Sequence, residues 1–264
     1  MAKYLTEFIG TFIFVLTIGL VVCQGVEMAP LVIGCVLMII VYMGGHVSGG
    51  HYNPAVSLAA MMRGAMSSVD LIPYWIAQVA GSLAGACVCA VIFGGLGGAA
   101  ATEDAAALDQ PSAAYVSVVA QDEEAAVATI SGEDNLKRGF FGPAPGKPFT
   151  LTQPGPWIIE IVFTFALCLV VLNTATSTGT SGNSFYGLAI GFTIVVAAFA
   201  GGGISGGAFN PAIGIGPNVI KGTLGGDPGA MANIILHTLG PIIGGALAAV
   251  VFKIQEASVV KAAS

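Results

Sequence analysis

Two stretches of the chain carry nearly the same sequence. Residues 45–57 read GHVSGGHYNPAVS and residues 202–214 read GGISGGAFNPAIG, so seven of thirteen positions are identical. The apolar segments that precede them also match, because Glu7 and Glu160 are each followed four residues later by a threonine. A repeat of this kind indicates that the chain consists of two halves built alike.

The Asn-Pro-Ala sequence in each copy predicts the start of a helix. Asn is a favoured N-cap, because its side-chain oxygen accepts from free backbone N–H groups of the first turn. Pro suits the first helical position, where no N–H is needed. The apolar stretches after Asn53 and Asn210 run for about ten residues, whereas a span needs about 20. We therefore expect two re-entrant half-helices, with the amide NH2 donors of both asparagines free to face a cavity.

The composition indicates an all-α membrane protein. Hydrophobic residues make up 55% of the 264 positions and charged residues only 8%, against about 25% charged in a soluble domain. A soluble enzyme and a disordered chain are both excluded. The first apolar segment has no cleavage pattern for a signal peptide. Six transmembrane helices plus the two half-helices are expected, and the six spans are roughly 4–24, 30–45, 71–94, 156–175, 184–201 and 231–253.

Three spans in each half make the arrangement an inverted repeat. An odd number of spans turns the second half upside down, and such repeats place a shared site near the bilayer midplane. We expect a first repeat over 1–94, a second over 156–264, and an acidic extramembrane loop over 95–155 with a short helix near 119–130. The loop holds eight of the 14 acids, namely Glu103, Asp104, Asp109, Asp122, Glu123, Glu124, Glu133 and Asp134.

Several other classes of function are excluded. The net charge of −6 gives no basic face for nucleic acid. The odd number of cysteines, all in or beside apolar runs, makes a disulfide framework unexpected. No nucleophile–base pair and no metal-ligand spacing stands out, so we expect no enzyme activity, no metal and no cofactor. The five cysteines are Cys23, Cys35, Cys87, Cys89 and Cys168.

Two helix N-termini that meet inside a membrane favour a channel. Each carries roughly half a positive charge, so their meeting point repels cations. Two Asn amides there can both donate to the oxygen of one water, which disfavours proton hopping. The expected function is a passive channel for water and other small neutral solutes, such as urea, glycerol or ammonia. The alternative is a secondary transporter with inverted repeats. Such a transporter needs ionisable groups in the middle of the membrane, and this chain offers only Glu7 and Glu160, near the starts of their spans.

The sequence resembles the aquaporin (major intrinsic protein) family over nearly the whole chain except 95–155. The resemblance implies six tilted helices, two half-helices, a pore in every subunit and a homotetramer. The matching motifs are Glu7-Phe8-x-Gly10-Thr11, Gly45-His46-x-Ser48-Gly49-Gly50-His51-x-Asn53-Pro54-Ala55-Val56, Ala77-Gln78, Gly206-x-x-Phe209-Asn210-Pro211-Ala212 and Gly240-Pro241-x-x-Gly244.

The resemblance also implies a selectivity filter of four residues, located by their spacing from the two asparagines. They are Ile33, Ala198, Gly207 and Ile213. Most family members have Arg at the position of Ile213, and glycerol facilitators have Asp at the position of Gly214. The filter of this chain should therefore be wider and less cationic than a water-only filter.

Four further residues have two interpretations each. Glu7 and Glu160 are buried acids within spans, which favours a functional site, but the resemblance implies that they brace the irregular loops. His46 and His51 flank the first Ser-Gly-Gly, where they either form structural hydrogen bonds or sense pH as a gate.

The orientation in the membrane follows from the basic residues, which are divided four and four between the two sides. Three of those on the outer side lie in the long loop, which counts least in the positive-inside rule. We expect both termini in the cytoplasm and a location in the plasma membrane.

Overall fold

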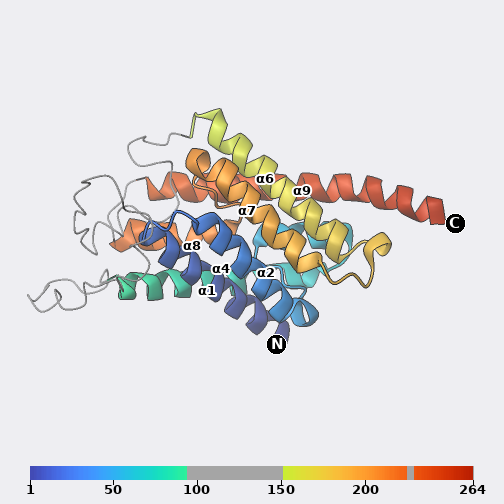
Figure 1. The fold of residues 1–264 in the computed structure, drawn as a ribbon, viewed down its shortest axis with the longest axis horizontal. Helices are drawn as coiled ribbons and strands as arrows, with labels where there is room; N and C mark the ends of the chain where they lie inside the picture. The colour runs from blue at the N-terminus through green and yellow to red at the C-terminus, as the bar shows by residue number, and fades with distance from the viewer. Residues whose placement is uncertain (94–150, 225–228, 264) are drawn as a thin grey trace, which may run out of the picture.

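The computed structural model describes residues 1–93, 151–224 and 229–263. Within these ranges, six helices are long and apolar enough to cross a membrane, and they lie side by side in one bundle (Figure 1). An even number of spans places both chain ends on the same side. The six are α1 (Ala2–Cys23), α2 (Ala29–Ser48), α4 (Ser68–Ile92), α6 (Pro154–Ala175), α7 (Tyr186–Ser205) and α9 (Ala230–Ala263).

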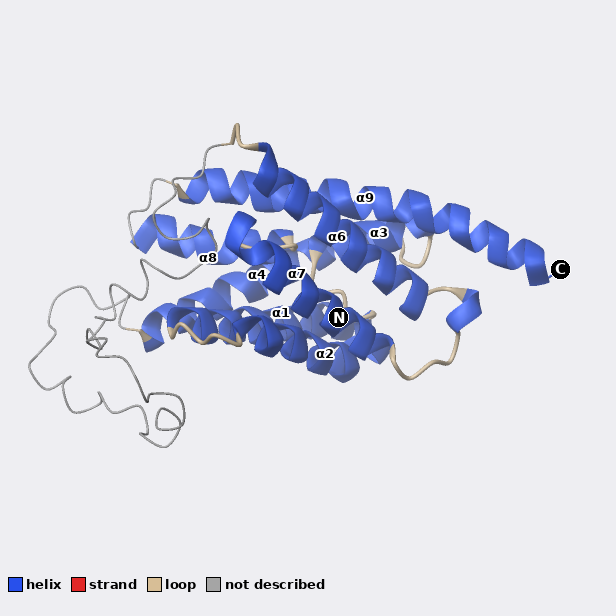
Figure 2. Cartoon of the chain, turned by 45° about the horizontal axis from the view of Figure 1, so that its top comes forward, coloured by secondary structure: helices blue, strands red, loops and turns tan. Residues whose placement is uncertain are grey.

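Two shorter helices complete the bundle, and each begins at an Asn-Pro-Ala proline. They are α3 (Pro54–Arg63) and α8 (Pro211–Leu224), and a single 3₁₀ turn, η2 (Thr178–Thr180), lies between α6 and α7. Figure 2 shows that the described chain consists of helices and connecting loops. The expected half-helices are therefore present, although α8 has 14 residues instead of about ten and continues through Pro217.

Some expected boundaries were wrong. Helices α2 and α7 continue to the serine of each Ser-Gly-Gly, and each ends where Gly49 or Gly206 adopts a φ near +90°. That left-handed conformation suits glycine and terminates a helix. Helix α9 extends beyond residue 253 to Ala263, because a charged helix end can continue outside the membrane. The expected loop and short helix fall mostly in residues 94–150, which lie outside the described residues.

Glycines bring pairs of spans into backbone contact. A Cβ added to Gly81 of α4 would lie 2.3 Å from the carbonyl oxygen of Phe8 on α1. A Cβ added to Gly244 of α9 would lie 2.4 Å from the carbonyl oxygen of Ile161 on α6. No side chain fits at either distance. These small residues allow close packing between helices, as in many membrane proteins.

The two halves meet along a pseudo-two-fold axis. Gly34 on α2 and Gly191 on α7 occupy equivalent positions, and an added Cβ on either would lie 2.5 Å from the carbonyl oxygen of the other. Equivalent residues touch each other only where a two-fold axis passes between them. The spacing from Gly34 to Gly191 equals that from Asn53 to Asn210, so the same operation relates the starts of the two half-helices.

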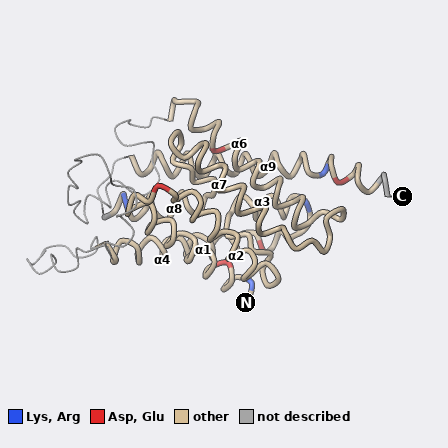
Figure 3. Tube along the Cα trace, viewed as in Figure 1, with Lys and Arg blue, Asp and Glu red and all other residues tan. Residues whose placement is uncertain are grey.

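Charged residues are few in the described part of the chain. Apart from Glu7 and Glu160, their positions along the chain trace lie towards helix ends or in connections (Figure 3). Apolar side chains such as Leu5, Ile76 and Val196 are exposed on the outer surface of the bundle, where the acyl chains of a bilayer would cover them. The two buried glutamates are therefore the acidic residues that lie inside the bundle in the described part of the chain.

Candidate functional site

The two half-helices begin with the same capping geometry. The Oδ1 atom of Asn53 accepts from the backbone N–H of Ala55 at 2.8 Å, and Oδ1 of Asn210 accepts from that of Ala212 at 3.0 Å. Both asparagines are 3% exposed. Each cap satisfies one of the backbone donors that a helix start leaves without an intrahelical partner. The N-cap geometry expected from the sequence is therefore present in both halves.

The asparagine amides also connect the two halves to each other. The Nδ2 atom of Asn53 donates to the carbonyl oxygen of Phe209 at 3.0 Å, and Nδ2 of Asn210 donates to that of Tyr52 at 2.8 Å. The expectation that both amide hydrogens stay free was therefore wrong. One hydrogen of each amide holds the opposite half, and the other remains for a ligand.

An uncommon backbone conformation makes this connection possible. Tyr52 has φ 46° and Phe209 has φ 49°, and they are the only non-glycine residues with positive φ in the described ranges. This region is disfavoured for bulky side chains. Both rings are nearly fully buried, at 0% and 1% exposed, so packing maintains the strained backbone. The strain turns each carbonyl towards the asparagine of the other half.

Glu7 holds the first loop, defined as residues 49–53. Its Oε1 accepts from the Ser48 hydroxyl at 2.7 Å and from the backbone N–H of His51 at 2.9 Å. Its Oε2 accepts from the backbone N–H of Tyr52 at 2.6 Å and from Nε2 of Gln78 at 2.8 Å. The carboxylate is completely buried. All four donors lie in the first loop or beside it, and the bracing role of Glu7 stays a prediction.

Glu160 holds the second loop, defined as residues 206–210, in the same way. Its Oε1 accepts from the Ser205 hydroxyl at 2.7 Å and from the backbone N–H of Ala208 at 3.1 Å. Its Oε2 accepts from the backbone N–H of Phe209 at 2.8 Å. This carboxylate is also completely buried. Hydrogen bonds from N–H donors compensate the cost of burying a charge.

The last span of each half contributes a further contact that the sequence analysis missed. The hydroxyl of Tyr74 on α4 donates to the carbonyl oxygen of Ser48 at 2.7 Å. On α9, Nε2 of His237 lies 2.8 Å from the carbonyl oxygen of Ser205. Both residues stand four positions before a matched motif residue, Gln78 or Pro241 in the two halves. This shared spacing is the sequence signal that could have predicted that Tyr74 and His237 correspond to each other.

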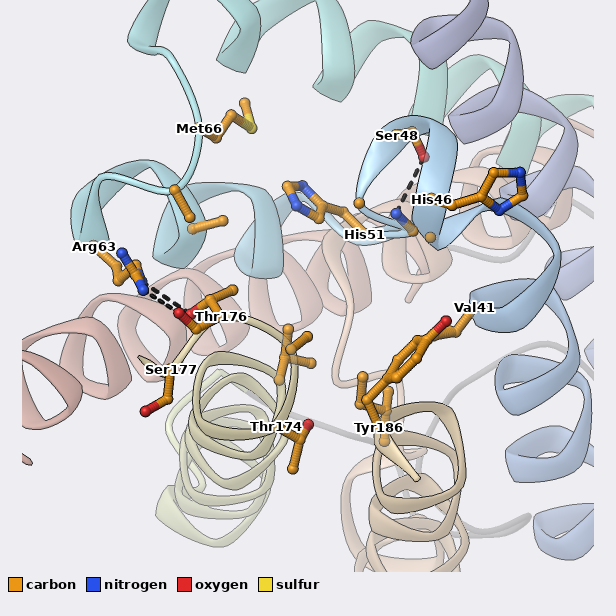
Figure 4. A pocket seen from close by; sticks show the side chains of 18 of the residues that line it. Val41, His46, Ser48, His51, Arg63, Met66, Thr174, Thr176, Ser177 and Tyr186 are labelled. Atoms are coloured by element: carbon orange, nitrogen blue, oxygen red, sulfur yellow. Dashed lines mark hydrogen bonds between the residues drawn. The ribbon is translucent and has the colours of Figure 1, made fainter. Parts of the chain in front are cut away.

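The two histidines of the first half have different surroundings. His51 is partly buried, with Nδ1 3.1 Å from the Ser57 hydroxyl and its ring centroid 5.3 Å from that of Tyr74. His46 is exposed. Both line a cavity of about 750 Å³, and Figure 4 shows both of them beside it. The cavity lies where α2, α3 and α6 end and α7 begins, which is the side of the chain termini.

Arg63 closes one wall of this cavity (Figure 4). It stands at the end of α3, where Nε donates to the Thr176 hydroxyl at 2.9 Å and an Nη atom donates to the Thr176 carbonyl. Its guanidinium also lies 5.3 Å from the ring centroid of Phe252 on α9. This contact was not predicted, because 113 positions separate Arg63 from Thr176 in the sequence.

The four expected filter residues lie on different elements. Ile33 is on α2, Ala198 on α7, Gly207 in the second loop and Ile213 on the first turn of α8. Gly207 has φ 69°, and an added Cβ would lie 3.0 Å from the Cα of Gly202. Ile213 is 3% exposed. Whether the four face one constriction remains a prediction.

Gly214 explains why this chain has no acid after the filter position. A Cβ there would lie 2.4 Å from the Cβ of His237 and 3.1 Å from its carbonyl oxygen, so α9 leaves no room for a side chain at this position. The described ranges also contain no cluster of three or more His, Cys, Asp or Glu residues that could hold a metal ion.

Comparison with known proteins identifies the family. The family model described as "Major intrinsic protein" matches residues 1–133 and 145–252. The "Glycerol uptake facilitator protein-like 6" of Lactiplantibacillus plantarum is 29% identical over 252 residues, which cover 94% of this chain and 95% of that protein. "Aquaporin-8" of Notomys alexis is 34% identical over 194 residues, which cover 72% of this chain and 58% of that relative.

The fold has a known counterpart. The X-ray structure of the aquaglyceroporin from Plasmodium falciparum superposes with a TM-score of 0.68 at 17% identity, covering 94% of this chain and 93% of that one. At this identity the match concerns the fold alone. The family match and the six apolar helices together make the chain an integral, multi-pass membrane protein of the major intrinsic protein family.

Proposed function

We propose that the protein is a passive channel for water and other small neutral solutes, and that it excludes protons and ions. The observation that carries the proposal is the meeting of two half-helix N-termini at Asn53 and Asn210, whose amides each donate to the opposite half. The positive ends of both helix dipoles oppose cations there. The names of the similar proteins, an aquaporin and a glycerol facilitator, support the same class of solute.

Proton exclusion follows from the remaining amide hydrogens. Each Nδ2 of Asn53 and Asn210 has one hydrogen that the opposite carbonyl does not use. A water that passes between them accepts from both through its single oxygen, so its own hydrogens point away along the path. A continuous chain of donors, which proton hopping needs, is thereby interrupted, as in pores whose selectivity depends on lining donors and dipoles.

The proposed filter is formed by Ile33, Ala198, Gly207 and Ile213. All four are apolar, and two have almost no side chain, so solutes larger than water can pass. Because Ile213 replaces the usual cation, the filter is also less cationic and wider than a water-only filter. We therefore expect water together with urea, glycerol or ammonia as solutes.

The two buried glutamates argue against a coupled transporter. A proton- or sodium-coupled carrier needs ionisable groups that are exposed to the transport path. Glu7 and Glu160 are completely buried, and their oxygens already accept from loop donors. They therefore serve as braces in this proposal, and they do not relay protons.

The assembly, location and gating belong to the same proposal. We infer a homotetramer with one pore per subunit, placed in the lipid bilayer of the plasma membrane with both termini in the cytoplasm. The cavity beside His46 and His51 would then be the cytoplasmic vestibule. Its two histidines stand where a pH-dependent gate would act.

Osmotic swelling of proteoliposomes tests the channel proposal. The purified protein is reconstituted, and stopped-flow light scattering follows the flux of water, urea, glycerol and ammonia with and without a proton gradient. We expect flux that follows the solute gradient and is unchanged by the proton gradient. Uphill accumulation of any of these solutes when a proton gradient is applied would establish the transporter instead.

A further inference from the structure

We propose that His237 positions the second loop and makes its geometry respond to protons, whereas Tyr74 holds the first loop without titrating. The inference rests on the proposed channel function and adds a regulatory residue to it. It assigns different properties to two side chains that occupy equivalent places in the two repeats.

The equivalence is geometric. The Tyr74 hydroxyl lies 2.7 Å from the carbonyl oxygen of Ser48, and Nε2 of His237 lies 2.8 Å from that of Ser205. Both serines are the last residue of the span that leads into a loop, and both hydroxyls donate to the bracing glutamate of their half. An imidazole ring can take up a second proton and become a cation, whereas a phenol cannot. Of these two contacts, only the one to Ser205 is therefore made by a side chain that can gain a positive charge.

The contact with Ser205 determines the tautomer of the neutral ring. A carbonyl oxygen can only accept, so Nε2 of His237 carries a hydrogen in the neutral form. Nδ1 is then a bare acceptor. It is buried and has no hydrogen-bond partner among the residues that the structure describes. Nδ1 can therefore accept a proton, although the ring is completely buried.

One acidic group faces the ring. Nε2 of His237 lies 3.8 Å from Oε1 of Glu160 on α6, and both side chains are 0% exposed. Helix α8 packs against His237 at Gly214, where an added Cβ would lie 2.4 Å from the Cβ of His237. The one charged residue of α8, Lys221, lies two turns further along the helix. Helix α7 contributes the Ser205 carbonyl, and Arg63, the charged residue of α3, instead contacts Phe252.

Protonation of His237 changes how Glu160 holds the second loop. The same Oε1 atom that faces the ring accepts from the Ser205 hydroxyl and, at 3.1 Å, from the backbone N–H of Ala208. The Ala208 bond is the longest that Glu160 makes to the loop. A cation at 3.8 Å in a buried site attracts the carboxylate strongly, and so competes with that bond. Acidification therefore loosens the loop next to Gly207, and we expect the flux to fall.

The test compares water permeability at pH 8.0 and pH 5.5 in proteoliposomes of the full chain and three variants. The unmodified protein should lose at least about half of its permeability at pH 5.5. His237→Tyr installs the group that the first repeat uses, so it should keep the permeability measured at pH 8.0 and lose the pH response. His237→Phe removes the hydrogen bond to Ser205, so it should have low permeability at both pH values.

The reciprocal variant Tyr74→His provides the matched control. Tyr74→His should keep the pH response of the unmodified protein and add a second pH response. The reason is that an imidazole then holds each of the two loops. If His237→Tyr retains the full pH response, the response belongs to His46 or His51 and our inference is wrong. It is also wrong if the unmodified protein conducts water equally at both pH values. Absence of water flux at every pH would instead overturn the proposed channel function.

Discussion

The first and second loops have the same backbone path but differ in the side chains that support it. Around the first loop, Gln78 donates from Nε2 both to Glu7 at 2.8 Å and to the Ser57 hydroxyl at 2.9 Å, and His51 contacts the same hydroxyl. The second half has Pro241, Gly214 and Ala208 at the equivalent positions. Those residues offer no side-chain donor or acceptor.

This difference indicates that the two loops have different roles. Glu7 accepts four hydrogen bonds from the first loop and its neighbours, whereas Glu160 accepts three. The first loop is part of a cross-linked polar network, whereas Pro241, Gly214 and Ala208 add no side-chain hydrogen bond around the second loop. We infer that the first half supplies rigidity, while the second half leaves the space in which solutes are selected.

Removal of one brace should have the largest effect. Glu7→Gln replaces a carboxylate with a group that has one acceptor oxygen and two extra donors, so two of the four loop donors lose their acceptor. We expect a loss of about 2–4 kcal/mol of stability, measured as thermal unfolding in detergent by circular dichroism. Glu160→Gln should be less harmful, because it has fewer partners. An equal or larger loss for Glu160→Gln would contradict the inferred rigidity of the first half.

Asn210→Asp should change ion exclusion without removing the cap. A carboxylate oxygen can still accept from Ala212, but the donor to the Tyr52 carbonyl is lost and a negative charge is gained. Unmodified vesicles should hold a cation gradient, whereas variant vesicles should leak cations at a measurable rate. A potential-sensitive dye reports the leak, and Asn210→Gln serves as the uncharged control. If vesicles that contain folded Asn210→Asp protein hold the cation gradient, the proposed electrostatic role of Asn210 is wrong.

Ile213→Arg should narrow the pore beside the second loop and leave the first loop unchanged. Its side chain is longer than Ile and carries donors and a charge. We expect urea or glycerol flux to fall several-fold more than water flux, measured by stopped-flow swelling. Val56→Arg at the equivalent position of the first half is the comparison, and it should reduce stability more than selectivity. An equal loss of all solutes in folded Ile213→Arg would count against a filter at this position.

Ser57→Ala should have the smallest effect. It removes one hydroxyl that contacts Gln78 and His51 and donates to the Asn53 carbonyl. We expect a loss of about 1 kcal/mol and unchanged solute selectivity, measured by thermal unfolding and swelling of the same preparation. A clear change in the ratio of urea to water flux would show that the first loop also selects solutes.

The repeated motif was enough to predict the half-helices and the asparagine caps, because capping depends on residues next to each other in sequence. The family resemblance also implied that Glu7 and Glu160 brace the loops. The cross-contacts between Asn53 and Phe209, and between Asn210 and Tyr52, could not be predicted, because they require positive φ at two bulky residues. Local preferences oppose that conformation, and only packing in the folded chain maintains it.

The contacts of His237 and Arg63 were also beyond the sequence analysis, for a different reason. Each depends on a partner far away in the chain, at Ser205 and Thr176 respectively. A lone histidine in an apolar helix gives no sign of which carbonyl it meets. The shared spacing before Gln78 and Pro241 indicates that His237 corresponds to Tyr74, but it does not identify the carbonyl that each side chain meets.

The ratio of proton to water permeability tests the central claim most directly. Proteoliposomes of the unmodified protein are loaded with a pH-sensitive dye, valinomycin and potassium balance the membrane potential, and water flux is recorded on the same preparation. The meeting of two half-helix N-termini predicts rapid water flux with a proton flux equal to that of protein-free vesicles. Rapid water flux accompanied by a proton flux well above that of protein-free vesicles would contradict the account.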